Sequence, residues 1–159
     1  FPTRRSSDLI YGVEGQVDYF FTDSEWSTGA NFNAIKSQTR VDGKWEKLTV
    51  DSASPSKMSA WVTWAPGDWT LRLQSTQTFD LSDEAGKHID GYNTVDLLGS
   101  YVLPVGKLSF SVENLLDEDY TTAWGQRAPG LYSPTYGAEN LYTYKGRGRT
   151  FGLNYSVLF

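Results

Sequence analysis

Residues 151–159, which read FGLNYSVLF, carry an apolar residue at every second position up to the last residue of the chain. Successive side chains on a β-strand point to opposite faces, so this period of two predicts a strand with one apolar face. A strand of about 9–11 residues crosses a bilayer when it is tilted. The segment therefore predicts a membrane-crossing strand whose apolar face carries Phe151, Leu153, Tyr155, Val157 and Phe159.

The same alternation recurs in six segments upstream, and no segment carries a convincing helical stripe. These predicted strands cover residues 11–21, 26–36, 57–65, 69–76, 94–103 and 108–112. Soluble strands average about 5–6 residues, so the length of most of these segments favours a membrane. Seven strands would leave open edges in lipid, and bacterial single-chain barrels have even strand numbers. We therefore expect an all-β fold that is part of an antiparallel transmembrane β-barrel.

The connections between these strands differ in length in a regular way. Short turns at residues 22–25, 66–68 and 104–107 contain the Pro, Gly, Asp or Ser residues that favour tight reversals. Much longer connections cover residues 38–56, 80–93 and 115–148. Outer-membrane barrels have short periplasmic turns and long extracellular loops, so this sorting supports the barrel. Connections as long as the last one are usually functional.

The amino-acid composition disfavours several classes of function. The chain has 159 residues, no Cys, one His and a net charge of −5, which disfavours disulfides, thiolate metal sites and nucleic-acid binding. No Ser or other nucleophile has a partner base in the pattern, so we expect no catalytic residues and no metal site. Aromatic residues make up 15% of the chain. Several of them stand near strand ends, where aromatic girdles of barrels lie: Tyr11, the rings of residues 19–21, Trp26, Trp64, Trp69, Tyr101 and Phe159.

Two stretches carry a family resemblance. Residues 112–120 read VENLLDEDY, an apolar strand followed by Asn-Leu-x-Asp-x-x-Tyr, in which Asn114 and Asp117 are expected to cap a tight turn and Tyr120 to anchor the loop base. Together with the terminal strand, this motif resembles TonB-dependent outer-membrane siderophore receptors. Residues 12–15 and 91–97 resemble two further strand motifs of that family.

The resemblance covers residues 10–159 and implies the C-terminal part of a barrel of about 22 strands, without the plug domain. Residues 1–9, FPTRRSSDL, resemble the conceptual translation of a sequencing adapter, so we expect them to lie outside the domain. The family implies uptake of a ferric siderophore across the outer membrane of a Gram-negative bacterium. Its implied partners are the siderophore, TonB acting through a missing N-terminal region, outer-membrane lipid, and the barrel-assembly machinery that reads the terminal strand. Iron would arrive chelated, as substrate and not as a cofactor.

The last long connection holds the candidate ligand-binding residues. Arg and Lys pair with carboxylates of an anionic chelate, and aromatic rings pack on its organic part. Within the family, a narrower resemblance is to receptors for aerobactin-like hydroxamate siderophores, and it is carried by residues 124–129, 132–134 and 144–149. The same rings and charges would also serve to pack the loop on the barrel rim. For Arg147 and Arg149, a place at the lumen wall or rim is preferred over ligand contact. The candidates are Trp124, Arg127, Tyr132, Tyr136, Tyr142, Tyr144, Lys145 and Arg147.

Two other classes of protein remain open on the residues alone. A porin or adhesin would share the terminal strand but is not expected to carry the motif at residues 112–120. A soluble carbohydrate-binding β-sandwich would also be acidic and rich in aromatic residues, but it would form two packed sheets and dissolve without detergent.

Overall fold

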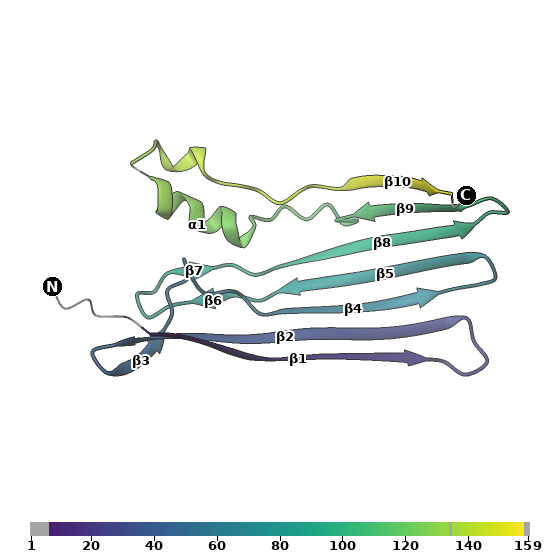
Figure 1. Ribbon diagram of the computed structural model, residues 1–159. Coiled ribbons are helices and arrows are strands. Elements are labelled where there is room, and N and C mark those ends of the chain that lie inside the picture. The colour runs from purple at the N-terminus through teal and green to yellow at the C-terminus, as the bar shows by residue number, and fades with distance from the viewer. Residues whose placement is uncertain (1–6, 134, 158–159) are drawn as a thin grey trace.

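Seven long strands form one antiparallel sheet in the computed structural model, which describes residues 7–133 and 135–157. The strands follow each other in the order β1-β2-β4-β5-β8-β9-β10, so each pairs with its neighbour in the chain (Figure 1). They are β1 (Asp8–Phe20), β2 (Trp26–Val41), β4 (Lys57–Trp64), β5 (Trp69–Thr78), β8 (Tyr92–Val102), β9 (Lys107–Glu113) and β10 (Thr150–Ser156). No helix in this part of the chain is long and apolar enough to span a membrane.

The pairing register separates the sheet into an apolar and a polar face. Residues directly opposite each other on paired strands share a face. One row across the sheet is apolar from strand to strand: Val62, Leu73, Leu97, Val112 and Phe151. A row on the opposite face of the sheet is polar from strand to strand: Gln16, Asn31, Ser59, Thr76 and Thr94. Because all seven long strands belong to one two-faced sheet, the predicted alternation is confirmed, and the described residues do not form the two-sheet sandwich.

Aromatic pairs mark the apolar face beside the short turns. The Trp26 and Trp64 rings stack with their centroids 5.8 Å apart, and Trp69 lies 4.6 Å from Tyr101. Both pairs join residues directly opposite each other on neighbouring strands. Their place at one end of the apolar face agrees with the predicted girdle. Phe159, another predicted aromatic position, lies outside the described residues.

Glycines let large rings lie flat on the sheet. The Phe110 ring covers its cross-strand partner Gly99, so closely that a Cβ there would overlap the ring. On the polar face, Trp61 covers Gly29 in the same way, and the Arg72 guanidinium lies 4.7 Å from the Trp61 ring centroid. Trp61 is consequently buried on a face that is otherwise polar, which the alternation alone did not indicate.

One end of the sheet has short turns and the other has long connections, as expected, but these connections contain more secondary structure than predicted (Figure 1). β2 continues to Val41 and pairs with β3 (Lys44–Lys47), so the predicted loop from Gln38 begins too early. Asp42 and Gly43 both have positive φ, 47° and 85°, which fits the primed two-residue turn that Asp-Gly favours. A second small hairpin pairs β6 (Leu81–Ser82) with β7 (His88–Ile89).

The last connection contains a helix, α1 (Ala123–Tyr132), and a short 3-10 helix, η1 (Glu139–Leu141), which corrects the expectation of no helix. The Thr122 side chain caps α1 by accepting a hydrogen bond from the Gly125 N–H at 3.0 Å. Only Gly125 and Ala128 of this helix are buried, and Pro129, a poor helix former, lies inside it. Two small buried residues make no apolar stripe, which is why the sequence pattern did not reveal α1.

The first strand starts earlier than predicted. β1 begins at Asp8, and Asp8 and Leu9 pair with Thr39 and Gln38. The predicted strand, residues 11–21, therefore starts three residues late, whereas the exclusion of residues 1–9 from the domain stays a prediction.

The sheet leaves its edges and its apolar face uncovered. Among the described residues, β1 pairs only with β2 and β10 only with β9. Val13, Val17, Phe151 and Leu153 are more than 60% exposed. Expressed alone and refolded in detergent, the chain should therefore aggregate or stay unfolded, because unpaired strand edges associate. Gel migration before and after heating tests this; a monomer that resists SDS until it is heated would contradict it.

Candidate functional site

The three long connections pack together at one end of the sheet and enclose a small apolar core. Leu48, Val50 and Ala53 come from the connection after β3, Ile89 from β7, and Ala128 from α1, and all five are buried. Most buried apolar residues of the described chain therefore lie in these connections and few in the sheet. We call residues 48–56, 80–91 and 114–149 the loop cluster.

The carboxylate of Asp83 joins the first two connections. Its oxygens accept hydrogen bonds from the N–H groups of Val50 (3.2 Å), Ala85 (3.0 Å) and Lys87 (3.0 Å). Burial favours a higher pKa for Asp83, but the three N–H donors and the Lys87 ammonium outweigh it and lower the pKa below its ordinary value. Lys87 also forms an ion pair with Asp51 at 2.9 Å. A charged Asp83 thus holds the two connections together at neutral pH.

Two neighbouring residues of α1 fasten the third connection to the others. The Gln126 side chain accepts a hydrogen bond from the Asp90 N–H at 2.8 Å and donates one to the Asp90 carbonyl at 2.9 Å. Arg127 donates to the carbonyl of buried Ala53. Burial lowers the pKa of Arg127, and nearby Asp51 acts in the opposite direction. The guanidinium of this candidate ligand-binding residue is therefore engaged in loop packing.

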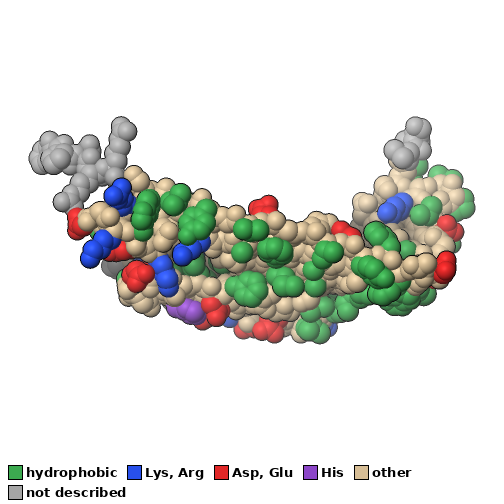
Figure 2. Space-filling view, turned by 90° about the horizontal axis from the view of Figure 1, so that it is seen from below, with side chains coloured by type: hydrophobic (Ala, Val, Ile, Leu, Met, Phe, Trp, Pro, Cys, Tyr) green, Lys and Arg blue, Asp and Glu red, His purple; other side chains and the backbone are tan. Residues whose placement is uncertain are grey.

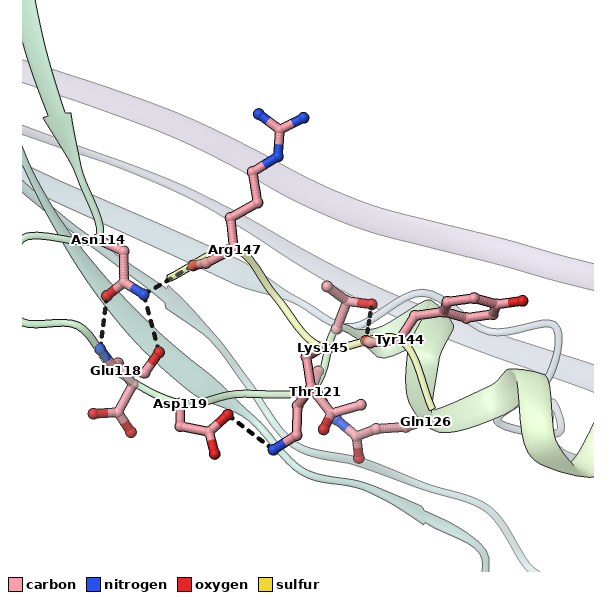
Figure 3. Close-up of polar contacts among 9 residues, drawn as sticks. Asn114, Glu118, Asp119, Thr121, Gln126, Tyr144, Lys145 and Arg147 are labelled. Carbon is pink, nitrogen blue, oxygen red and sulfur yellow. Dashed lines mark hydrogen bonds and ion pairs between the residues drawn. The ribbon is translucent and has the colours of Figure 1, made fainter. Parts of the chain in front are cut away.

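Asn114 closes the base of the last connection (Figure 3). Its side-chain amide donates to the carbonyls of Glu118 (2.9 Å) and Arg147 (3.0 Å) and accepts from the Glu118 N–H at 2.9 Å. Its own N–H donates to Asp96 on β8 at 2.8 Å. Since Asn114 is only 4% exposed, these bonds form in a place that water does not reach. One side chain thus joins the two ends of a connection more than thirty residues long.

The turn after Asn114 has the predicted form. Asn114 and Asp117 both adopt positive φ, 50° and 55°, and the Asp117 N–H donates to the Asn114 carbonyl at 2.9 Å. The Asp117 carboxylate accepts from the Arg149 N–H at 2.8 Å, next to the start of β10. Asn and Asp tolerate this conformation better than other non-glycine residues. The predicted capping role of both residues is confirmed.

Tyr120 anchors the loop base by stacking on Tyr92 of β8, with ring centroids 4.3 Å apart. Its carbonyl accepts a hydrogen bond from the Gly146 N–H at 2.8 Å, and a Cβ at Gly146 would overlap the Tyr120 ring. Burial raises the pKa of Tyr120 above its ordinary value, and Tyr92 and Asp96 act in the same direction. The phenol therefore stays neutral. The anchoring role was predicted, but its partner Tyr92 was not, because no local pattern links the two rings.

Four of the five candidate aromatic residues form one cluster. The Tyr132 ring lies 6.2 Å from Trp124, 6.3 Å from Tyr136 and 5.4 Å from Tyr142. Trp124 and Tyr136 remain 49% and 72% exposed, so this cluster presents ring surface to solvent. Tyr144 is the fifth, and its side chain points away from the loop base in Figure 3.

The candidate cations are in three different situations. Arg127 binds Ala53, as described, and Lys145 forms an ion pair with Asp119 at 2.8 Å. Arg147 is exposed and makes no ion pair with a described residue; its side chain extends away from the loop base (Figure 3). Arg147 is therefore the candidate best placed to meet an anion.

Two hollows lie beside these residues. One, at the loop base, is lined by Tyr92, Tyr120, Gln126 and Lys145 together with three acidic residues, Asp90, Glu118 and Asp119. Its excess of negative charge disfavours an anionic ligand. The other follows the polar face of the sheet past Arg72, Thr63, Ser109 and Asn154. Within the described ranges, no group of three or more His, Asp or Glu side chains is placed to hold a metal ion.

Comparison with known proteins relates the chain to a family of receptors. A profile described as TonB dependent receptor-like, beta-barrel matches residues 3–115. The ferric aerobactin receptors of Escherichia coli and Klebsiella pneumoniae are each 66% identical to the chain over 150 residues, covering 94% of the chain. The rhizobactin receptor of Rhizobium meliloti (strain 1021) is 35% identical over 152 residues.

The chain spans only about a fifth of the length of these curated relatives, 20% in each case. Among solved structures, the copper transporter OprC superposes with a TM-score of 0.67 and 24% identity. The superposition covers 91% of this chain and 22% of the OprC chain. At that identity, the likeness to OprC concerns the fold alone.

Replacing Asn114 with Ala should loosen the base of the last connection, since each buried group left unpaired costs about 1–3 kcal/mol. A suitable host is a receptor chimera in which residues 10–159 replace the matching segment of the E. coli ferric aerobactin receptor. Hydrogen exchange should become at least about tenfold faster for residues 114–120 and 145–149. Asn140→Ala, at an exposed position of η1, serves as the control. Equal protection in both variants would refute the role of Asn114.

Proposed function

The chain belongs to the TonB-dependent receptor-like β-barrel family, and we propose that it forms part of an outer-membrane receptor that takes up a ferric siderophore. The observation that carries this proposal is the 66% identity to two ferric aerobactin receptors over nearly the whole chain. In this proposal the polar face lines the barrel lumen and the apolar face meets lipid. The short turns then face the periplasm, and the loop cluster faces the cell exterior.

The proposed ligand is a ferric hydroxamate siderophore of the aerobactin type. Such a chelate is anionic, and an exposed guanidinium pairs with carboxylate oxygens in a bidentate way. Arg147, which has no ion-pair partner in the described chain, supplies that group, and the exposed rings of Trp124, Tyr136 and Tyr144 supply packing surface. Iron is the cargo and enters already chelated, so the chain itself provides no metal ligand.

The proposed partners act at other places on the molecule. TonB would contact a part of the receptor outside residues 10–159 and supply the energy for import. The barrel-assembly machinery would read the last strand, where Phe151, Leu153 and Tyr155 are exposed on the apolar face of β10. We assign the chain no enzymatic activity, because the import of an already chelated ion neither forms nor breaks a covalent bond in the ligand.

Arg147→Gln in the receptor chimera should weaken binding of ferric aerobactin by about 10–100-fold, the loss of one charge-assisted contact of about 1.5–3 kcal/mol. Binding of iron-55-labelled siderophore to cells that lack their own receptor measures the effect. Lys107→Gln removes the same charge at the other end of the sheet, beside a short turn, and should leave binding unchanged.

The variant Arg127→Gln tests the role of a side chain in loop packing separately from ligand contact. Because Arg127 binds Ala53, this variant should speed hydrogen exchange in residues 48–56, which Arg147→Gln should not do. If the unmodified chimera supports no uptake, the proposed function is wrong. If Arg147→Gln binds like the unmodified chimera, the assignment of Arg147 is wrong.

A further inference from the structure

A group of basic residues stands on the apolar face, on β2 and β3. Lys36 and Arg40 follow Phe32 and Ala34 on the same face of β2, because alternate residues share a face. Lys47 of β3 lies opposite Gln38 of β2, and Trp45 lies opposite Arg40, so both share that face. We call Lys36, Arg40 and Lys47 the basic patch. Figure 2 shows Lys and Arg side chains gathered at this end of the molecule.

The height of the basic patch matches the edge of a bilayer. Lys36 is ten residues beyond Trp26, which belongs to the aromatic pairs beside the short turns. Ten residues span about 33 Å along a strand and about 23 Å across a membrane at a tilt of about 45°. The apolar band of an outer-membrane barrel is about 25 Å tall. Arg40 and Lys47 follow within about 9 Å above Lys36, comparable to a headgroup layer of about 5–8 Å.

The charges of the basic patch are not neutralised within the described chain. All three side chains are exposed and none forms an ion pair with a described residue. The acidic neighbours Asp8 and Glu46 both lie opposite Thr39 and therefore on the other face. Asp42 is at the hairpin turn. Three unneutralised cations thus stand together on a chain whose net charge is −5.

Two aromatic residues frame the basic patch. The Arg40 guanidinium lies 6.0 Å from the centroid of the Trp45 ring, which is 47% exposed. Tyr11 lies opposite Lys36, and its hydroxyl donates to Gln38 at 3.4 Å. Trp and Tyr favour the boundary between lipid and water, while Lys and Arg stretch their apolar stems along lipid and place the charge in the headgroup layer. This combination fits a phosphate-bearing lipid.

From these observations we propose that the basic patch binds the phosphate groups of lipid headgroups in the outer leaflet of the membrane. The proposal rests on the outer-membrane placement of the proposed function. The basic patch is on the opposite face from the polar lumen wall, and on β2 and β3, whereas Arg147 precedes β10 at the other edge of the sheet. It is therefore separate from the proposed siderophore site.

The test is binding of a phosphorylated lipid by the purified receptor chimera in neutral detergent. The probes are lipid A carrying two phosphates, the same lipid without phosphates, and inorganic phosphate, with Trp fluorescence as the readout. The variant K36Q/R40Q/K47Q should bind phosphorylated lipid A about a hundredfold more weakly, about fivefold for each cation. The matched control K44Q/K57Q/K107Q removes the same charge from the other face and should bind it normally.

Three outcomes would overturn the proposal: equal binding by the patch variant and the unmodified chimera, equal binding of both lipids, or inorganic phosphate binding as tightly as the lipid. Heat-modifiable migration on gels confirms that each variant is folded. Siderophore uptake is measured in parallel and should persist in the patch variant. Loss of uptake by the unmodified chimera with lipid binding intact would instead refute the proposed function alone.

Discussion

The structure depends on one constraint, which is that backbone N–H and C=O groups in lipid must pair within the protein. Neighbouring strands meet it for each other from β1 to β10, whereas the outer edges of β1 and β10 have no partner strand among the described residues. The register of this pairing also sorts the side chains, because a slip by one residue exchanges the two faces of a strand. Such a slip in β5 would move Arg72 into lipid and Leu73 into the lumen. One strand register therefore sets both the backbone hydrogen bonds and the separation of polar from apolar side chains in this sheet.

The loop cluster is organised in the opposite way. No described residues cover the apolar face of the sheet, whereas the loop cluster has its own small core around Ile89 and Ala128. Irregular backbone leaves many N–H and C=O groups without ladder partners, and here Asp83, Asn114 and Gln126 supply side-chain partners for them. The cluster is therefore a packed unit at the barrel mouth. That packing leaves Arg147 and the rings of Trp124 and Tyr136 exposed while it commits Arg127.

Much of the fold was predictable from the sequence, because alternation is a local pattern and each predicted strand is present. The β2–β3 hairpin was also within reach, since Asp42-Gly43 is a strong turn signal inside the predicted loop. α1 was not, because its buried side consists of Gly125 and Ala128 alone. The site was predictable only as a set of residue types. Contacts such as Arg127 with Ala53 and Tyr120 with Tyr92 join distant segments that no periodicity connects.

The most direct test of the account is whether neighbouring residues of β5 meet different surroundings. Leu73 is on the apolar face and Gln74 on the polar face. The chain has no Cys, so a single cysteine at either position of a receptor chimera without other cysteines takes one fluorophore. In membranes with brominated lipids, the label at position 73 should be strongly quenched and the label at position 74 should not. Equal quenching at both positions would contradict the assignment of the two faces to lipid and lumen.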